Sequence, residues 1–192
     1  MCKQHVRART GALKLAQNRD VHCLVAIALA RAGDSAEAEK LATELEKTFP
    51  LDTLIQRYWL PSIRAAIALD RKQPDKAIEF LKMTSDRELS MDYLTAIAVS
   101  LYPAYLRGEA YLMLHDGTRA AAEFQKFLDY RRLVGNFPLG ALARLCLARA
   151  FALQNDKARS GNAYAEFLTL WKDADPDLPL LKQAKSEYAK LR

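Results

Sequence analysis

The sequence contains little glycine and proline, with 7 of each among its 192 residues. Stretches rich in Ala, Leu, Glu, Lys, Arg and Gln fill most of the chain instead, and these residues have high helix propensity. Few segments alternate apolar and polar residues as a half-buried strand does. Hydrophobic residues make up 51% and charged residues 27%, a balance that favours a folded chain. The composition therefore predicts an all-α protein.

Cysteine is also rare, and the three residues present, Cys2, Cys23 and Cys146, are widely spaced. An odd number at these spacings fits neither a disulfide framework nor a zinc site. Cys23 and Cys146 lie in apolar helical segments, where we expect small core residues. Free thiols favour a reducing compartment.

Long hydrophobic runs are missing. No apolar run reaches the ~18 residues that a membrane span requires, and no long apolar region of a signal peptide follows the basic N-terminus. We therefore expect a cytoplasmic location and no membrane contact by this segment. A membrane span upstream in a longer protein would place it outside the cytoplasm, and a longer protein is expected because the chain starts within a helical pattern.

The net charge of +6 raises the question of nucleic acid. Lys and Arg are scattered, usually with Glu or Asp nearby, and the densest basic pair is Arg131–Arg132. One pair is too short for a stripe that follows a phosphate backbone. The charge pattern predicts no nucleic-acid binding by this segment.

Residues that could carry chemistry are not grouped. The three histidines, His5, His22 and His115, are far apart in sequence. The acidic residues of segment 173–177 lack the glycine and the final glutamate of a calcium loop, so a turn and helix cap is favoured. No serine lies in a nucleophile-elbow pattern. We therefore expect no metal, no cofactor and no enzymatic activity.

Four segments repeat one pattern: a helix with small and aromatic residues, a short polar turn, and a second helix. Their ranges are 19–50, 52–84, 101–132 and 137–171. A lone helix over 3–17 is expected before them, as half of an interrupted unit, and an amphipathic capping helix over 178–191 after them. The sequence leaves open whether 85–101 extends the next helix or forms a packed loop. We expect a single domain over 1–192.

Small and large residues recur at matching places in the four segments. The sets are Ala26, Leu29, Ala38 and Ala42; Ala65, Ala68, Ala77 and Leu81; Gly108, Tyr111, Ala120 and Phe124; and Ala148, Phe151, Ser160 and Tyr164. This pattern resembles the tetratricopeptide repeat (TPR) family, in which small residues mark the helix crossing and large residues fill the space beside it. The early small residue of each second helix recurs after 39, 43 and 40 residues, whereas a standard unit has about 34. We expect the additional residues between units.

Three stretches, LYPAYLRGEAYL, NFPLGALARLCLARAFAL and FLTLWKDADPDLPLLKQAKSEYAKLR, resemble the C-terminal TPR regions of bacterial, especially acidobacterial, proteins. In these, the repeats follow a eukaryotic-like serine/threonine kinase domain or a winged-helix DNA-binding domain of a transcriptional regulator. The chain itself has no glycine-rich phosphate loop, HRD or DFG segment.

The resemblance implies a right-handed superhelix of antiparallel helix pairs with a C-terminal capping helix. It also implies a protein–protein interaction scaffold within a signalling protein, binding a protein or peptide segment in its concave groove. An alternative is a regulatory or oligomerisation arm that docks on its own kinase or DNA-binding domain. The oligomeric state is left open.

The family geometry places the groove on the first helix of each unit. The groove residues implied for this chain are Arg31, Trp59, Tyr102, Tyr105, Glu109, Leu145 and Arg149. Aromatic residues and arginine are typical of protein-binding hot spots. Core packing is the alternative for Trp59 and Tyr105. Arg64 and Arg107 occupy equivalent places, and we expect them to bridge neighbouring helices or the carbonyl ends of those helices.

Overall fold

The computed structural model describes residues 18–89, 101–135 and 137–191, and within these ranges helices are the only regular secondary structure. The predicted all-α class is therefore confirmed. The chain divides into two compact units, 1–90 and 91–192. Each unit is described by itself below. The helix predicted over 3–17 lies outside the described residues, as does most of the segment 85–101 whose structure the sequence left open.

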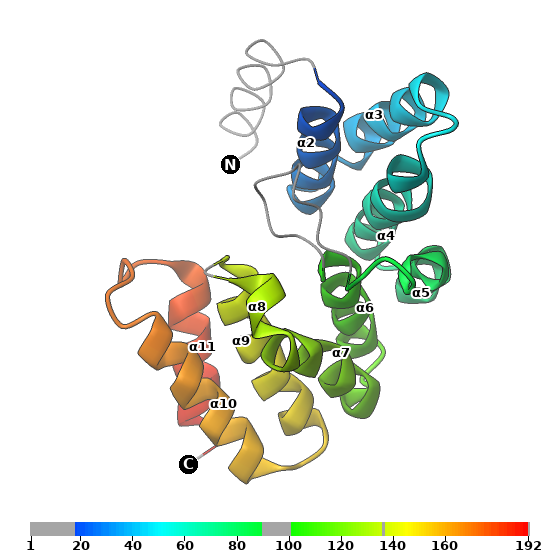
Figure 1. The fold of residues 1–192 in the computed structure, drawn as a ribbon. Helices are drawn as coiled ribbons and strands as arrows, with labels where there is room; N and C mark the ends of the chain where they lie inside the picture. Colours follow the sequence, from blue (N-terminus) through cyan, green and yellow to red (C-terminus); the bar gives the residue numbers. More distant parts are fainter. Residues whose placement is uncertain (1–17, 90–100, 136, 192) are drawn as a thin grey trace. The chain divides into compact units, whose positions relative to one another are not determined.

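The first unit contains two helix pairs (Figure 1). Helix α2 packs against α3, α4 packs against α5, and α4 also contacts α2 and α3. A π-helical segment, η1, leads directly into α4, and a 3-10 turn, η2, follows α5. The bounds are α2 Arg19–Arg31, α3 Ser35–Thr48, η1 Ile55–Trp59, α4 Leu60–Asp70, α5 Pro74–Leu81 and η2 Lys82–Thr84.

The second unit continues the pattern with two pairs and a final helix (Figure 1). Helix α6 packs against α7, α9 packs against both α7 and α10, and α11 lies against α10. The short helix α8 lies between α7 and α9 in the sequence and contacts both of them. The bounds are α6 Tyr102–Met113, α7 Gly117–Asp129, α8 Arg131–Val134, α9 Leu139–Leu153, α10 Lys157–Leu170 and α11 Pro179–Ala189. Each of the four predicted repeat segments holds one of the helix pairs.

The turn within each pair uses a left-handed backbone residue at the same place. Gly33 has φ 85°, Lys72 has φ 58°, and His115 and Asn155 each have φ 57°. Positive φ is uncommon for residues with a side chain, so its recurrence marks a defined turn geometry. These residues follow one another at the intervals of 39, 43 and 40 that the small residues show. The small residue at the crossing and the left-handed residue in the turn are therefore the same distance apart in sequence in all four pairs.

The residue after the left-handed position caps the second helix of three pairs. The side chains of Asp34, Asp116 and Asp156 accept hydrogen bonds from the backbone N–H groups of Glu37, Arg119 and Arg159, respectively. Such caps satisfy an N–H group that the helix itself leaves without a partner. In the second unit, Arg119 and Arg159 also lie 4.5 Å above the rings of Tyr111 and Phe151. The two pairs of this unit thus share one capping arrangement.

Small residues mark the place where paired helices approach most closely. Ala26, Ala65, Gly108 and Ala148 are all buried. At Gly108, a Cβ atom would lie 2.6 Å from the ring of Phe124, much closer than van der Waals contact allows. At Ala148, the carbonyl oxygen accepts a hydrogen bond of 2.9 Å from the hydroxyl of Ser160 on the partner helix. The predicted small-against-large packing is present at Gly108 and Phe124, and the other pair brings the small residues Ala148 and Ser160 together.

Ion pairs connect neighbouring helices next to these crossings. Arg107 on α6 donates two hydrogen bonds of 2.9 Å to the carboxylate of Glu123 on α7. In the first unit, Arg64 on α4 donates a hydrogen bond of 2.7 Å to Glu46 on α3. The predicted bridging role of both arginines is confirmed. Burial by itself raises the pKa of Glu123, but hydrogen bonds and charges from Arg107 and Lys126 outweigh it and hold this pKa below its usual value.

We expect Gly108→Ala to lower the free energy of unfolding by about 1–3 kcal/mol, because the added methyl group would overpack against Phe124. The matched control is Gly161→Ala in α10, where the added Cβ would meet nothing closer than Tyr188 at 3.9 Å. This control should gain up to ~1 kcal/mol from the higher helix propensity of alanine. Urea unfolding followed by circular dichroism measures both changes. Equal stabilisation by the two substitutions would refute the close approach at Gly108.

We expect Glu123→Gln to lower the free energy of unfolding by about 1–3 kcal/mol near neutral pH, because it weakens charge-assisted hydrogen bonds. Since the folded-state pKa of Glu123 is depressed, its ionised form stabilises the fold above the unfolded pKa of about 4.3. That contribution disappears as the pH falls through the lower, folded-state pKa. The difference between wild type and variant should therefore shrink on acidification. The exposed Glu44 on α3 supplies the control Glu44→Gln, with an expected change below about 0.5 kcal/mol.

Candidate functional site

The two predicted groove residues of the first unit differ in exposure. Arg31 is exposed in the last turn of α2. Trp59 is only 2% exposed, and its ring meets that of Tyr58 edge-on at 5.4 Å between centroids. Trp59 thus contributes to the core of this unit, as the alternative interpretation proposed.

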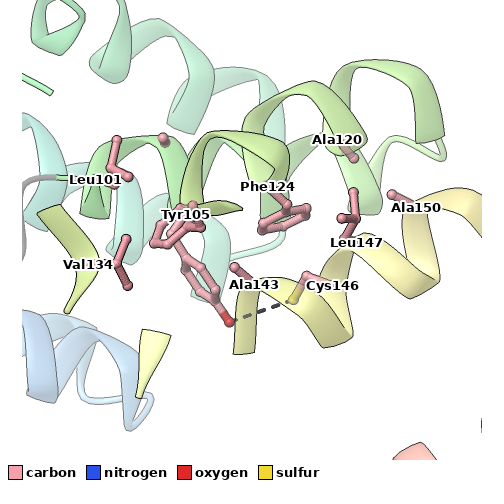
Figure 2. Close-up of a cluster of buried hydrophobic side chains, with 11 residues drawn as sticks. Leu101, Tyr105, Ala120, Phe124, Val134, Ala143, Cys146, Leu147 and Ala150 are labelled. Atoms are coloured by element: carbon pink, nitrogen blue, oxygen red, sulfur yellow. Dashed lines mark hydrogen bonds between the residues drawn. The ribbon is translucent and has the colours of Figure 1, made fainter. Parts of the chain in front are cut away.

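The predicted groove residues of α6 are mostly interior. Tyr105 is 6% exposed and lies edge-on to the rings of Phe124 and Phe127, with centroid distances of 5.7 and 6.1 Å. Figure 2 shows its hydroxyl pointing to Cys146 on α9, 3.7 Å from the sulfur. Tyr102 is also buried and stacks on Tyr105 at 6.5 Å between centroids, whereas Glu109 is partly exposed.

The predicted groove residues of α9 face the last two helices. Leu145 is 1% exposed and belongs to a cluster with residues of α10 and α11. The guanidinium of Arg149 donates hydrogen bonds of 2.9 and 3.2 Å to Glu187 of α11, which also accepts one of 2.9 Å from the hydroxyl of Tyr164. Burial and the Glu187 carboxylate raise the pKa of Tyr164, so the hydroxyl keeps its proton and donates it.

Most of the groove residues implied by the family geometry therefore stabilise the two units from within. The sequence predicted these residues as groove residues, but other helices of the same unit cover several of them, as α9 covers Tyr105 and α11 covers Arg149. Their contact with a partner stays a prediction. Arg31 is exposed, and Glu109 and Arg149 are partly exposed.

A surface hollow in the second unit was not identified from the sequence. Its volume is about 640 Å³, and it is lined by the end of α7, by α8, by the start of α9 and by the end of α10. Arg131, Arg132 and Arg144 line it together with the aromatic residues Phe137 and Trp171. We refer to this site as the arginine hollow.

The backbone around α8 builds the arginine hollow. Gly135 ends α8 with φ 54° and ψ −138°, a conformation that favours glycine. Gly140 lets α8 approach α9, because a Cβ at this position would lie 2.8 Å from Val134. The chain thereby holds Arg131 and Arg132 at the rim, where both are exposed.

The lining carries positive charge without a carboxylate. Arg144 donates a hydrogen bond of 2.8 Å to the carbonyl of Gly140 and lies 3.5 Å from Glu166. Arg131 and Arg132 form no ion pair with any residue in the described ranges. Helix α9, whose first residues line the hollow, also begins without a side-chain cap. Its positive dipole end adds to the field of the arginines.

The sequence contained one signal for this site. The pair Arg131–Arg132 ends the predicted repeat segment 101–132, and as a basic pair it suggested only a contact with nucleic acid. The remaining lining residues come from positions up to 44 apart in the chain, from Phe127 to Trp171, so their meeting depends on the tertiary structure.

Comparison with known proteins assigns no family: no family model, curated protein or solved structure matches the chain. Within the described ranges, no helix combines the length and apolar character needed to cross a membrane. The same residues contain no group of three or more His, Cys, Asp or Glu side chains placed to hold a metal ion.

We expect Glu187→Gln to lower the free energy of unfolding by about 1–3 kcal/mol, because Arg149 and Tyr164 both bond to this carboxylate. The control is Glu166→Gln on α10, whose carboxylate is largely exposed and 3.5 Å from Arg144. Its expected change is below about 1 kcal/mol, as for other surface ion pairs. Thermal unfolding of the two variants measures the difference. Equal losses would show that the bonds to Glu187 contribute no more than a surface pair.

Proposed function

We propose that this chain is a protein-interaction module of the TPR type, acting as a scaffold within a larger bacterial signalling protein. Two observations support the TPR type. Small residues recur at the helix crossings at the intervals at which left-handed residues recur in the turns. Within each unit, helices pair with their neighbours in sequence, as the units of a repeat protein do.

The arginine hollow is the observation that supports a binding role most directly. It combines exposed guanidinium groups with aromatic walls, and these are the side chains that dominate the binding energy of protein interfaces. Its volume lies within the range of sites that hold a small molecule or a few side chains. A segment of a partner protein is the ligand that such a surface accommodates best.

The proposal is tested by selecting randomised linear peptides displayed on phage against the purified, folded chain. We expect a family of related peptides to be enriched and to bind the chain in solution, as measured by fluorescence anisotropy. The heat-unfolded chain serves as the control for non-specific adsorption. If no sequence is enriched over that control, this chain is no peptide-binding module.

The same preparation tests the alternative of an oligomerisation arm. Light scattering measures the mass of the free chain over a range of concentrations. A stable dimer or higher oligomer would favour that alternative over a scaffold for a separate partner.

A further inference from the structure

We propose that the arginine hollow recognises an acidic segment of its partner, binding carboxylates at the rim and an apolar side chain against the aromatic wall. This inference rests on the proposed function and specifies the chemistry of the ligand. It concerns a surface between α7, α8, α9 and α10, and none of the groove residues implied by the family resemblance lines it.

The charge of the hollow is the first argument. Three arginines line it, and no Asp or Glu does. The surrounding stretch 101–191 has thirteen Lys and Arg against ten Asp and Glu. The stretch as a whole is therefore positively charged. A ligand with negative charge complements this part of the surface.

The use of arginine elsewhere in the unit is the second argument. Arg107 and Arg149 each form two hydrogen bonds to a carboxylate on a neighbouring helix. Arg131 and Arg132 form no such pair within the described ranges, although they stand on the surface of the same unit. Guanidinium groups bind carboxylates with two parallel hydrogen bonds, and in this pair those donors are available to a ligand.

The walls of the hollow are the third argument. Phe137, Leu170 and Trp171 line it, and all three are at least partly exposed. Phe127 and Val134 also line it and are buried. An aliphatic or aromatic side chain of the ligand can cover this apolar surface while neighbouring carboxylates contact the rim. The hollow therefore fits a segment in which acidic and apolar residues alternate or adjoin.

The surroundings favour a protein segment over nucleic acid. A second, shallower depression adjoins the hollow through Arg144 and Leu170, and it is lined by Asn162, Thr169 and Glu166. A carboxylate at this edge would repel a phosphate backbone that continues past the hollow. Nucleic-acid surfaces carry a longer basic stripe, whereas a short acidic segment needs only the cations present here.

The inference is tested with the peptides enriched from the randomised library. We expect them to be rich in Asp and Glu beside an apolar residue, and to bind more weakly at high salt. Replacing their acidic residues by Asn and Gln should weaken binding about tenfold or more, because charge-assisted hydrogen bonds are lost. This change leaves the folding of the chain untouched.

The protein side is tested with the double variant Arg131→Gln and Arg132→Gln. It should also weaken binding about tenfold or more, while the double variant Lys157→Gln and Lys185→Gln should retain it. The control removes the same charge from two exposed lysines of the same unit that do not line the hollow.

Tryptophan fluorescence locates the bound peptide. The chain has two tryptophans, so Trp59→Phe leaves Trp171 in the wall of the hollow as the single probe. Acidic peptides should change the emission of the Trp59→Phe variant and leave that of Trp171→Phe unchanged.

Five results would overturn the inference. Enriched peptides without acidic residues, or binding that survives the arginine double variant, would leave the proposed function standing with a different site. If no peptide is enriched, both the proposed function and this inference are refuted. Tighter binding of a single-stranded DNA oligonucleotide, lost in the arginine double variant, would assign the hollow to nucleic acid. A dimer that dissociates in that variant would assign it to a second copy of the chain.

Discussion

Two paired helices approach each other closely in this structure, and the packing of the other elements follows from that contact. It requires a residue with little or no side chain on the first helix opposite a large one on the second, as Gly108 faces the ring of Phe124. The capped, left-handed turn between the helices fixes which residues can meet at the crossing. Because the turn residue and the crossing residue recur at the same intervals, all four pairs form the same local structure.

Ion pairs between neighbouring helices stabilise this arrangement further. Arg64, Arg107 and Arg149 each reach a glutamate on a neighbouring helix, at distances between 2.7 and 3.2 Å. A half-buried guanidinium needs such a partner, because an unpaired charge away from water is costly. These arginines therefore serve the fold, whereas Arg131 and Arg132 are left accessible at the surface. This contrast distinguishes structural arginines from those offered to a ligand.

The arginine hollow arises at the connection between α7 and α9. This connection contains α8, and Gly135 and Gly140 allow this short helix to lie against α9. The regular part of each pair encloses its large side chains, as Figure 2 shows for Tyr105 and Phe124. The connection that contains α8, in contrast, leaves arginine and aromatic side chains exposed around the arginine hollow. Surface chemistry in this unit is concentrated at the irregular connection.

The helical class, the four helix pairs and the residues at their crossings could be predicted from the sequence. These features depend on interactions between residues close in the chain, such as the cap at Asp116 and the turn at His115, so a local pattern specifies them. The sequence also pointed to Tyr105, Leu145 and Arg149 as residues of a binding surface. That these side chains are covered could not be predicted, because their partners are distant in the chain: Cys146 lies 41 residues from Tyr105, and Glu187 lies 38 from Arg149. The arginine hollow was likewise decided by tertiary structure, since its walls come from four helices that meet only after the pairs have packed together.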